Sequence, residues 1–98
     1  MNKALEGIRV IDIGQLVQGP QAGATLADMG AQVIKIELPM VGDLSRWIDC
    51  SPEDNRNAYY VACNRGKQCM TLISTIRSGQ RSLVFQSVGR CTDRYLLQ

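Results

Sequence analysis

Two short runs of β-branched residues lie near the start of the chain, and a glycine-bearing loop and an amphipathic stretch separate them. Residues 7–13 and 32–37 are rich in isoleucine and valine, a composition typical of parallel strands buried on both faces. The segment between them predicts a helix over about residues 20–29, and residues 68–72 predict a third parallel strand. This order of elements indicates a parallel βαβ unit of an α/β, Rossmann-like fold.

The predicted helix has a clear apolar period. Ala22, Leu26 and Met29 recur at helical spacing, so we expect these three side chains to face the sheet. Gly30 follows directly and fits a left-handed helix stop.

The loop between the first strand and the helix is the first candidate for a binding site. Gly14 and Gly19 allow a tight exit from the strand, and Pro20 suits the first helical position, where an N–H would have no intrahelical partner. A loop at the carboxyl end of a strand lies where open α/β sheets bind ligands, which favours a nucleotide-like ligand. The glycine spacing differs from both the dinucleotide fingerprint and the phosphate loop, so a standard nicotinamide dehydrogenase or phosphate-loop NTPase is disfavoured.

Several motifs in a fixed order carry a resemblance to a known family. They are Leu5-x-Gly-Ile-x-Val-x-Asp12, Gly19-Pro20, Leu26-Ala-Asp-Met-Gly-Ala-x-Val-Ile-Lys-Ile-Glu37, Pro39, Gly42-Asp43, Ser45-Arg46 and Asn64-Arg-Gly-Lys67. Over residues 1–72 the chain resembles the amino-terminal segment of family III CoA-transferases, which include formyl-CoA transferases, carnitine and bile-acid CoA-transferases and α-methylacyl-CoA racemases.

The resemblance implies an acyl-CoA substrate, transfer of CoA between carboxylic acids, and two subunits interlocked like links. It places the catalytic aspartate beyond residue 98, so we expect no catalytic residue in this chain. The family's CoA contacts would fall on Val17, Gln18, Leu38 and Leu72. Leu38 stands where many members have an arginine, and the loss of that guanidinium removes a planar donor suited to phosphate or adenine.

Other motifs have a structural and a chemical interpretation. Asp43 is expected to cap a short turn with Trp47 as a partly buried anchor, although Arg46 beside this tryptophan would also suit stacking on an adenine or clamping a phosphate. Asn64-Arg-Gly-Lys67 is typical of a solvated turn, and only the resemblance favours a site wall. Ser51 begins a good helix-start sequence.

Composition limits the kinds of partner and cofactor that we expect this chain to bind. The 98 residues carry a net charge of +2 with scattered cations, which argues against nucleic acid. A signal peptide and a long apolar segment are not apparent, so we expect no membrane association and a cytoplasmic location. Histidine is missing and the four cysteines lack Cys-x-x-Cys spacing, so we expect no metal site, no histidine-dependent hydrolase and four reduced thiols.

The resemblance stops at about Leu72. The family continues with Asp-Leu and then Pro-Glu-Gly, whereas this chain continues Ile73-Ser-Thr-Ile-Arg-Ser-Gly79. Those residues, encoded as ATC-TCA-ACG-ATC-CGG-AGT-GGC and preceded by G, become Asp-Leu-Asn-Asp-Pro-Glu-Trp in the shifted frame, which indicates a frameshift after Leu72. We therefore divide the chain into a family segment, 1–72, and a divergent or out-of-frame, poorly ordered tail, 73–98.

The tail itself has weak patterning. It favours a strand near residues 81–86 and, more weakly, a helix near 92–98, and neither has an evident partner. For the chain as a whole three functions stay open: a truncated CoA-transferase inactive alone, a fragment of an α-methylacyl-CoA racemase, or a small nucleotide-binding or interaction module that docks through a sheet edge.

Overall fold

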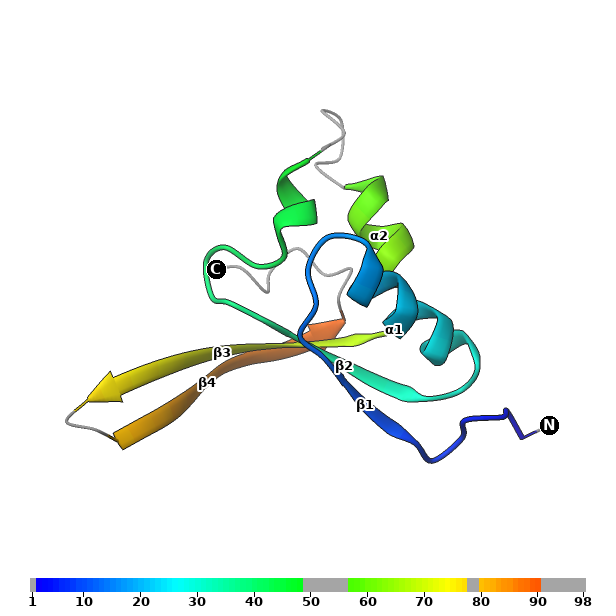
Figure 1. Cartoon of the computed structure of the whole chain (residues 1–98), viewed down its shortest axis with the longest axis horizontal. Helices are drawn as coiled ribbons and strands as arrows, with labels where there is room; N and C mark the ends of the chain where they lie inside the picture. Colours follow the sequence, from blue (N-terminus) through cyan, green and yellow to red (C-terminus); the bar gives the residue numbers. More distant parts are fainter. Residues whose placement is uncertain (1, 49–56, 78–79, 91–98) are drawn as a thin grey trace.

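The computed structural model describes residues 2–48, 57–77 and 80–90, and its side chains over residues 2–48 and 57–72 (Figure 1). Its elements in chain order are β1 (Arg9–Asp12), α1 (Gln18–Asp28), β2 (Gln32–Glu37), the 3₁₀ helix η1 (Leu44–Trp47), α2 (Ala58–Asn64), β3 (Gln68–Arg77) and β4 (Gln80–Arg90).

The strands form one sheet in the order β1-β2-β3-β4. β1 pairs with β2 and β2 with β3 in parallel, whereas β3 and β4 pair antiparallel. The predicted parallel βαβ unit, its third parallel strand and the α/β fold class are therefore confirmed.

The element bounds differ modestly from the predicted ones. β1 spans only Arg9–Asp12, and α1 begins at Gln18, two residues before Pro20. Pro20 still lies in the first turn, where its missing N–H loses no intrahelical bond. Gly30 has a φ of +105°, as predicted for the helix stop.

The second helix arises from a cap that the sequence motifs did not indicate. The Asn57 side chain accepts a hydrogen bond from the Tyr60 N–H at 3.0 Å and starts α2. The helix start expected at Ser51 lies outside the described residues.

α1 and α2 both lie on one side of the sheet (Figure 1), and the side chains beneath them are not the expected ones. On β2, Val33, Lys35 and Glu37 are buried, whereas the intervening isoleucines are half-buried on the other face. Ile11 on β1 is 58% exposed. The expectation of strands buried on both faces is therefore wrong for this chain, because the described residues supply helices to one face only.

The buried face of α1 also differs from the predicted one. Its buried residues are Pro20, Gly23 and Ala24, whereas Ala22 and Met29 are exposed. Gly23 faces inward because the Lys67 and Asp12 side chains occupy the space beneath it.

β3 and β4 form a long hairpin that projects from the rest of the molecule (Figure 1). The pairing of β3 with β2 ends at Thr71, and beyond it β3 pairs with β4 alone, after a register shift between Thr71 and Leu72. The strand predicted near 81–86 thus has a partner, and the contrary expectation was wrong. The helix suggested near 92–98 lies outside the described residues.

Candidate functional site: the loop after β1 and its charged support

The loop from Gly14 to Pro20 is closed by the contact of two glycines. A Cβ atom at Gly14 would lie 2.9 Å from Gly19 Cα, so a side chain there would force the two backbones apart. Between them Leu16 adopts a φ of +66°, a left-handed conformation that non-glycine residues rarely hold without support.

A hollow of about 190 Å³ opens beside this loop, at the carboxyl ends of β1 and β2. Its lining consists of Ile13, Gly14, Gln15, Lys35, Ile36, Glu37, Leu38, Gly42, Asp43 and Leu72. Two of the predicted CoA contacts, Leu38 just after β2 and Leu72 within β3, thus both line the hollow. The other two, Val17 and Gln18, are exposed at the start of α1 and are not part of this lining.

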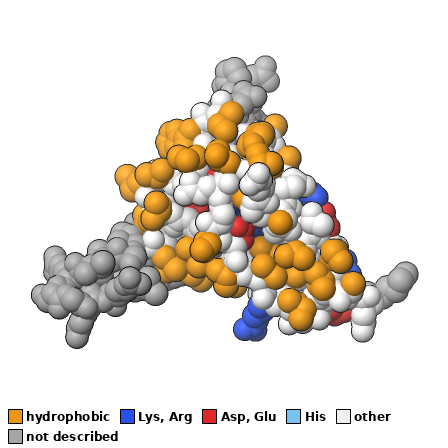
Figure 2. All heavy atoms as spheres, viewed as in Figure 1, with side chains coloured by type: hydrophobic (Ala, Val, Ile, Leu, Met, Phe, Trp, Pro, Cys, Tyr) orange, Lys and Arg blue, Asp and Glu red, His pale blue; other side chains and the backbone are white. Residues whose placement is uncertain are grey.

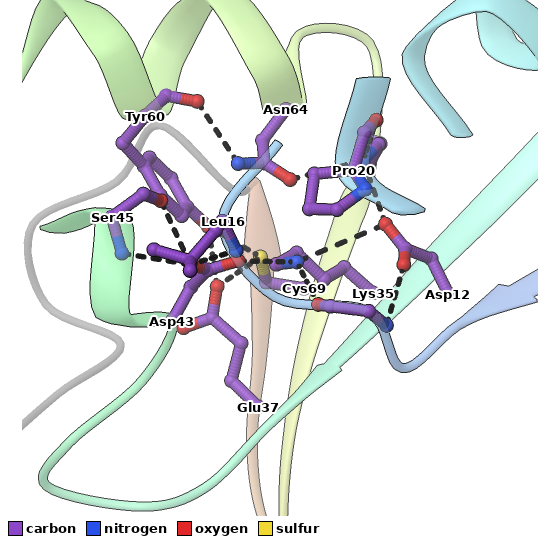
Figure 3. Close-up of polar contacts among 12 residues, drawn as sticks. Asp12, Leu16, Pro20, Lys35, Glu37, Asp43, Ser45, Tyr60, Asn64 and Cys69 are labelled. Atoms are coloured by element: carbon purple, nitrogen blue, oxygen red, sulfur yellow. Dashed lines mark hydrogen bonds and ion pairs between the residues drawn. The ribbon is translucent and has the colours of Figure 1, made fainter. Parts of the chain in front are cut away.

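Lys35 and Asp43 form a fully buried ion pair in the wall of the hollow (Figure 3). The Lys35 ammonium lies 2.7 Å from Asp43 Oδ2 and donates to the Gly14 carbonyl at 2.9 Å. Asp43 Oδ1 accepts from the Leu16 N–H at 3.0 Å and from the N–H and hydroxyl of Ser45 at 2.8 Å each. The prediction that Asp43 caps a short turn is confirmed, since η1 starts there.

These contacts set the ionisation of Asp43. Burial alone raises the pKa of this carboxyl, but the Lys35 ammonium and the hydrogen bonds from Ser45 and Leu16 outweigh it and hold the pKa below its ordinary value of 3.8. Asp43 is therefore a carboxylate at neutral pH.

A second buried ion pair joins β1 to the turn before β3. The Lys67 ammonium donates to Asp12 Oδ2 and to the Pro20 carbonyl, each at 2.7 Å, and to Asn64 Oδ1 at 3.0 Å. A Cβ atom at Gly23 would lie 3.0 Å from Lys67 Nζ, so this glycine in α1 leaves room for the pair. Neither a solvated turn nor a site wall describes Lys67, whose side chain is completely buried.

Burial also affects the proton affinity of Lys67. Desolvation lowers the pKa of its ammonium below 10.5, although Asp12 opposes this change. The pairing with Asp12 is therefore what offsets the cost of a cation under α1.

Glu37, Arg46 and Tyr60 form a third cluster where η1 meets α2. Figure 3 labels Glu37 and Tyr60 of this cluster. Arg46 donates to both oxygens of Glu37, at 3.0 and 3.2 Å, and its guanidinium lies 3.8 Å from the centre of the Tyr60 ring. Burial and the charge of Glu37 raise the pKa of Tyr60, so its hydroxyl stays protonated. Arg46 thus stacks within the protein rather than on an adenine, and Trp47 is 65% exposed rather than a partly buried anchor.

The cysteines differ from the expected set of reduced thiols. Cys63 is a free, buried thiol, whereas Cys69 is disulfide-bonded. Cys69 Sγ lies 3.4 Å from the Tyr60 hydroxyl oxygen.

The site is thus a hollow next to a fixed loop, with three buried ion pairs beneath both. The acidic residues Asp12, Glu37 and Asp43 each face a cation of the protein itself, so their charges are paired within the chain. Within the described residues, no group of three histidine, cysteine or acidic side chains is placed to hold a metal ion. None of the described helices is both long and apolar enough to cross a membrane.

A parallel βαβ unit with a loop and a hollow at the carboxyl ends of its strands defines a Rossmann-like α/β protein. Residues 5–87 match the model of CoA-transferase family III, and the chain belongs to that family. The match extends past Leu72, farther than the resemblance was expected to reach.

Curated relatives agree with this assignment. The chain is 37% identical over 95 residues to succinate–glutarate CoA-transferase of Agrobacterium fabrum, covering 91% of this chain and 23% of that protein. It is 39% identical over 83 residues to formyl-CoA:oxalate CoA-transferase of Streptomyces avermitilis, covering 85% of this chain and 20% of that one. The chain thus spans only about a fifth of these two relatives.

A solved structure supports the fold. A CAIB/BAIF family protein from Brucella suis superposes with a TM-score of 0.64 at 39% identity, covering 72% of this chain and 20% of that one. The assigned family and the parallel architecture therefore rest on sequence and on structure alike.

Proposed function

We propose that the chain is the CoA-binding amino-terminal part of a protein that transfers CoA between carboxylic acids, with acyl-CoA as substrate and an interlocked homodimer as the assembly. The observation that carries this is the hollow beside the loop after β1, because it lies at the carboxyl ends of parallel strands in a chain of this family. The relatives reported above are named as transferases, which favours transfer over racemisation. The cytoplasmic location remains a prediction.

The proposed CoA contacts are Val17, Gln18, Leu38 and Leu72. Val17 and Gln18 start α1, and the exposed Gln18 amide adds a donor and an acceptor for the nucleotide part of CoA. Leu38 and Leu72 supply apolar walls of the hollow. Leu38 offers no cation to a phosphate, so we expect weak binding.

Isothermal titration of the 98-residue chain with CoA tests this proposal. Gln18→Ala should raise the Kd by roughly tenfold, the effect of losing about one hydrogen bond. The matched control is Gln21→Ala, an equally exposed glutamine one turn along α1, which should leave the Kd unchanged. Leu38→Arg should lower the Kd, because it supplies a guanidinium at the edge of the hollow. An undetectable interaction with CoA, or equal effects of the two glutamine variants, would contradict the proposal.

Turnover provides a second test. We propose that the chain holds no catalytic residue, so it should transfer no CoA between succinyl-CoA and glutarate, the acids in the names of its relatives. Activity that persists through purification and heat inactivation of host enzymes would show that a nucleophile lies within these 98 residues.

A further inference from the structure

The loop after β1 holds a conformation that its own sequence does not favour. Leu16 has a φ of +66°, yet it carries a full side chain and is followed by no turn glycine until Gly19. A residue keeps such a conformation where its surroundings determine it. The contacts of the loop backbone therefore show what fixes its shape.

Lys35 and Asp43 supply the contacts to residues 14–16 that come from β2 and the start of η1. Asp12 at the end of β1 also accepts from the Gly14 N–H, and Lys67 binds the Pro20 carbonyl at the far end of the loop. The Lys35 ammonium binds the Gly14 carbonyl at 2.9 Å, and Asp43 Oδ1 binds the Leu16 N–H at 3.0 Å. The two side chains are 0% exposed and 2.7 Å apart, so each holds the other in place. Asp43 is itself fixed by its hydrogen bonds to Ser45 at the start of η1.

The same pair lines the hollow, so direct contact with the ligand must be distinguished from support of the loop. An ammonium has three N–H donors, and Lys35 faces three protein oxygens, of Asp43, of Gly14 and, at 3.8 Å, of Asp12. The first two contacts are of hydrogen-bond length, and the third donor faces the Asp12 carboxylate, which would repel a phosphate. The Lys35 side chain is also 0% exposed, so a ligand phosphate does not reach its ammonium without moving protein atoms. The geometry therefore favours an action on the ligand through the loop.

We infer that Lys35 and Asp43 are positioning residues, which hold residues 14–16 in the shape that receives the ligand beside α1. This inference rests on the proposed function for its ligand, CoA. The position of the loop itself is measurable without any ligand.

The test uses the double variant Lys35→Met/Asp43→Asn, because a single change would leave one buried charge unpaired. The control variant Asp28→Asn/Arg65→Met removes an ion pair with a 2.6 Å contact whose side chains are 52% and 45% exposed. The readouts are amide hydrogen exchange at Leu16, exchange in β2, and the Kd values for CoA and for dephospho-CoA.

In the Lys35/Asp43 double variant, exchange at Leu16 should accelerate at least about tenfold while β2 stays protected. The Kd values for CoA and dephospho-CoA should rise by the same factor, whereas a lost direct contact to the 3′-phosphate would raise that for CoA alone. The control should change none of these quantities. If the double variant does not fold, Lys35→Arg carries the same test, because it keeps a buried cation opposite Asp43 and changes the donor that reaches the Gly14 carbonyl.

Unchanged exchange at Leu16, or a loss of affinity confined to CoA, would overturn the inference. The two proposals fail separately. A wild-type chain that binds no CoA refutes the proposed function, and the exchange at Leu16 still decides whether the pair holds the loop.

Discussion

The buried pair of Asp12 and Lys67 gives the strongest stability prediction. Its side chains are 5% and 0% exposed and their charged atoms are 2.7 Å apart. Removing one partner of such a pair costs about 3–5 kcal/mol, because the other charge stays buried without compensation. A chain of this size has a free energy of unfolding of roughly 5–15 kcal/mol, so Lys67→Met should remove a large part of it.

The double variant Asp12→Asn/Lys67→Met should recover most of that loss, since no charge is left unpaired. Recovery should stop short of the wild type by about 1 kcal/mol for each of two acceptors, the Pro20 carbonyl and Asn64 Oδ1, that lose their donor. Urea unfolding followed by circular dichroism at pH 7 measures the free energy of unfolding of the wild type, the two single variants and the double variant, which together form a double-mutant cycle.

The exposed pair of Asp28 and Arg65, with a 2.6 Å contact, is the matched control for the Asp12–Lys67 cycle. Its coupling energy should stay below about 1 kcal/mol, because water screens it. Equal coupling energies for the buried and the exposed pair would refute the reasoning that burial makes the Asp12–Lys67 interaction matter.

Three further predictions concern other parts of the chain. Because the folded-state pKa of Asp43 lies below 3.8, its contribution to the free energy of unfolding is complete above that pH and is lost as the pH falls through the folded value. Between about pH 5 and pH 3, the range in which carboxyl groups titrate, the urea midpoint should therefore fall more in the wild type than in Asp43→Asn. Parallel curves of urea midpoint against pH for the two proteins would contradict this. Deleting residues 73–98 should lower the free energy of unfolding by only about 1–3 kcal/mol, because β4 pairs with β3 alone and the pairing of β2 with residues 68–71 stays intact. Fast amide exchange across the tail would agree with this, and collapse of the fold on deletion would show that the tail is native. Ile11→Lys should leave the thermal midpoint within a few degrees of the wild type, because Ile11 is 58% exposed, and unfolding of this variant would mean that the outer face of β1 is covered in solution.

The order of the elements could be predicted because it depends on local signals. The isoleucine-rich run before Gly14 forms β1, and Gly30 ends the region of α1 with the expected positive φ. Asp43 caps η1 because a short carboxylate bonds the backbone two residues ahead. These features need only neighbours in sequence.

The buried face of β2 could not be predicted in the same way. Val33, Lys35 and Glu37 alternate with two isoleucines, and such a pattern normally places the isoleucines inside. The structure buries the charged residues, because their partners come from other parts of the chain. Asp43 reaches Lys35, and Arg46 reaches Glu37. Long-range pairing of this kind leaves no periodic signal in a single sequence.

The candidate site shows the same division. The family resemblance singled out Leu38 and Leu72 as CoA contacts. Both line the hollow in the structure, although they are far apart in sequence. The support of the loop by Lys35 was missed, because a lone lysine within an apolar strand resembles a solvent-facing residue. The one available signal was its place two residues before Glu37 in the strand, which puts both charges on one face.

The two faces of the sheet therefore have different roles. The face beneath α1 and α2 carries ion pairs whose hydrogen bonds end on the loop backbone at Gly14, Leu16 and Pro20, so its polar interactions define the shape of a site. Figure 2 shows apolar side chains spread over the visible surface around a smaller acidic centre. Ile8, Ile11 and Ile13, in and beside β1, are exposed, and the two isoleucines of β2 are half-buried. Buried ion pairs add little net stability but tolerate few alternative geometries. In this fragment of the family fold, polar contacts under the helices thus specify the loop, while much apolar surface stays uncovered.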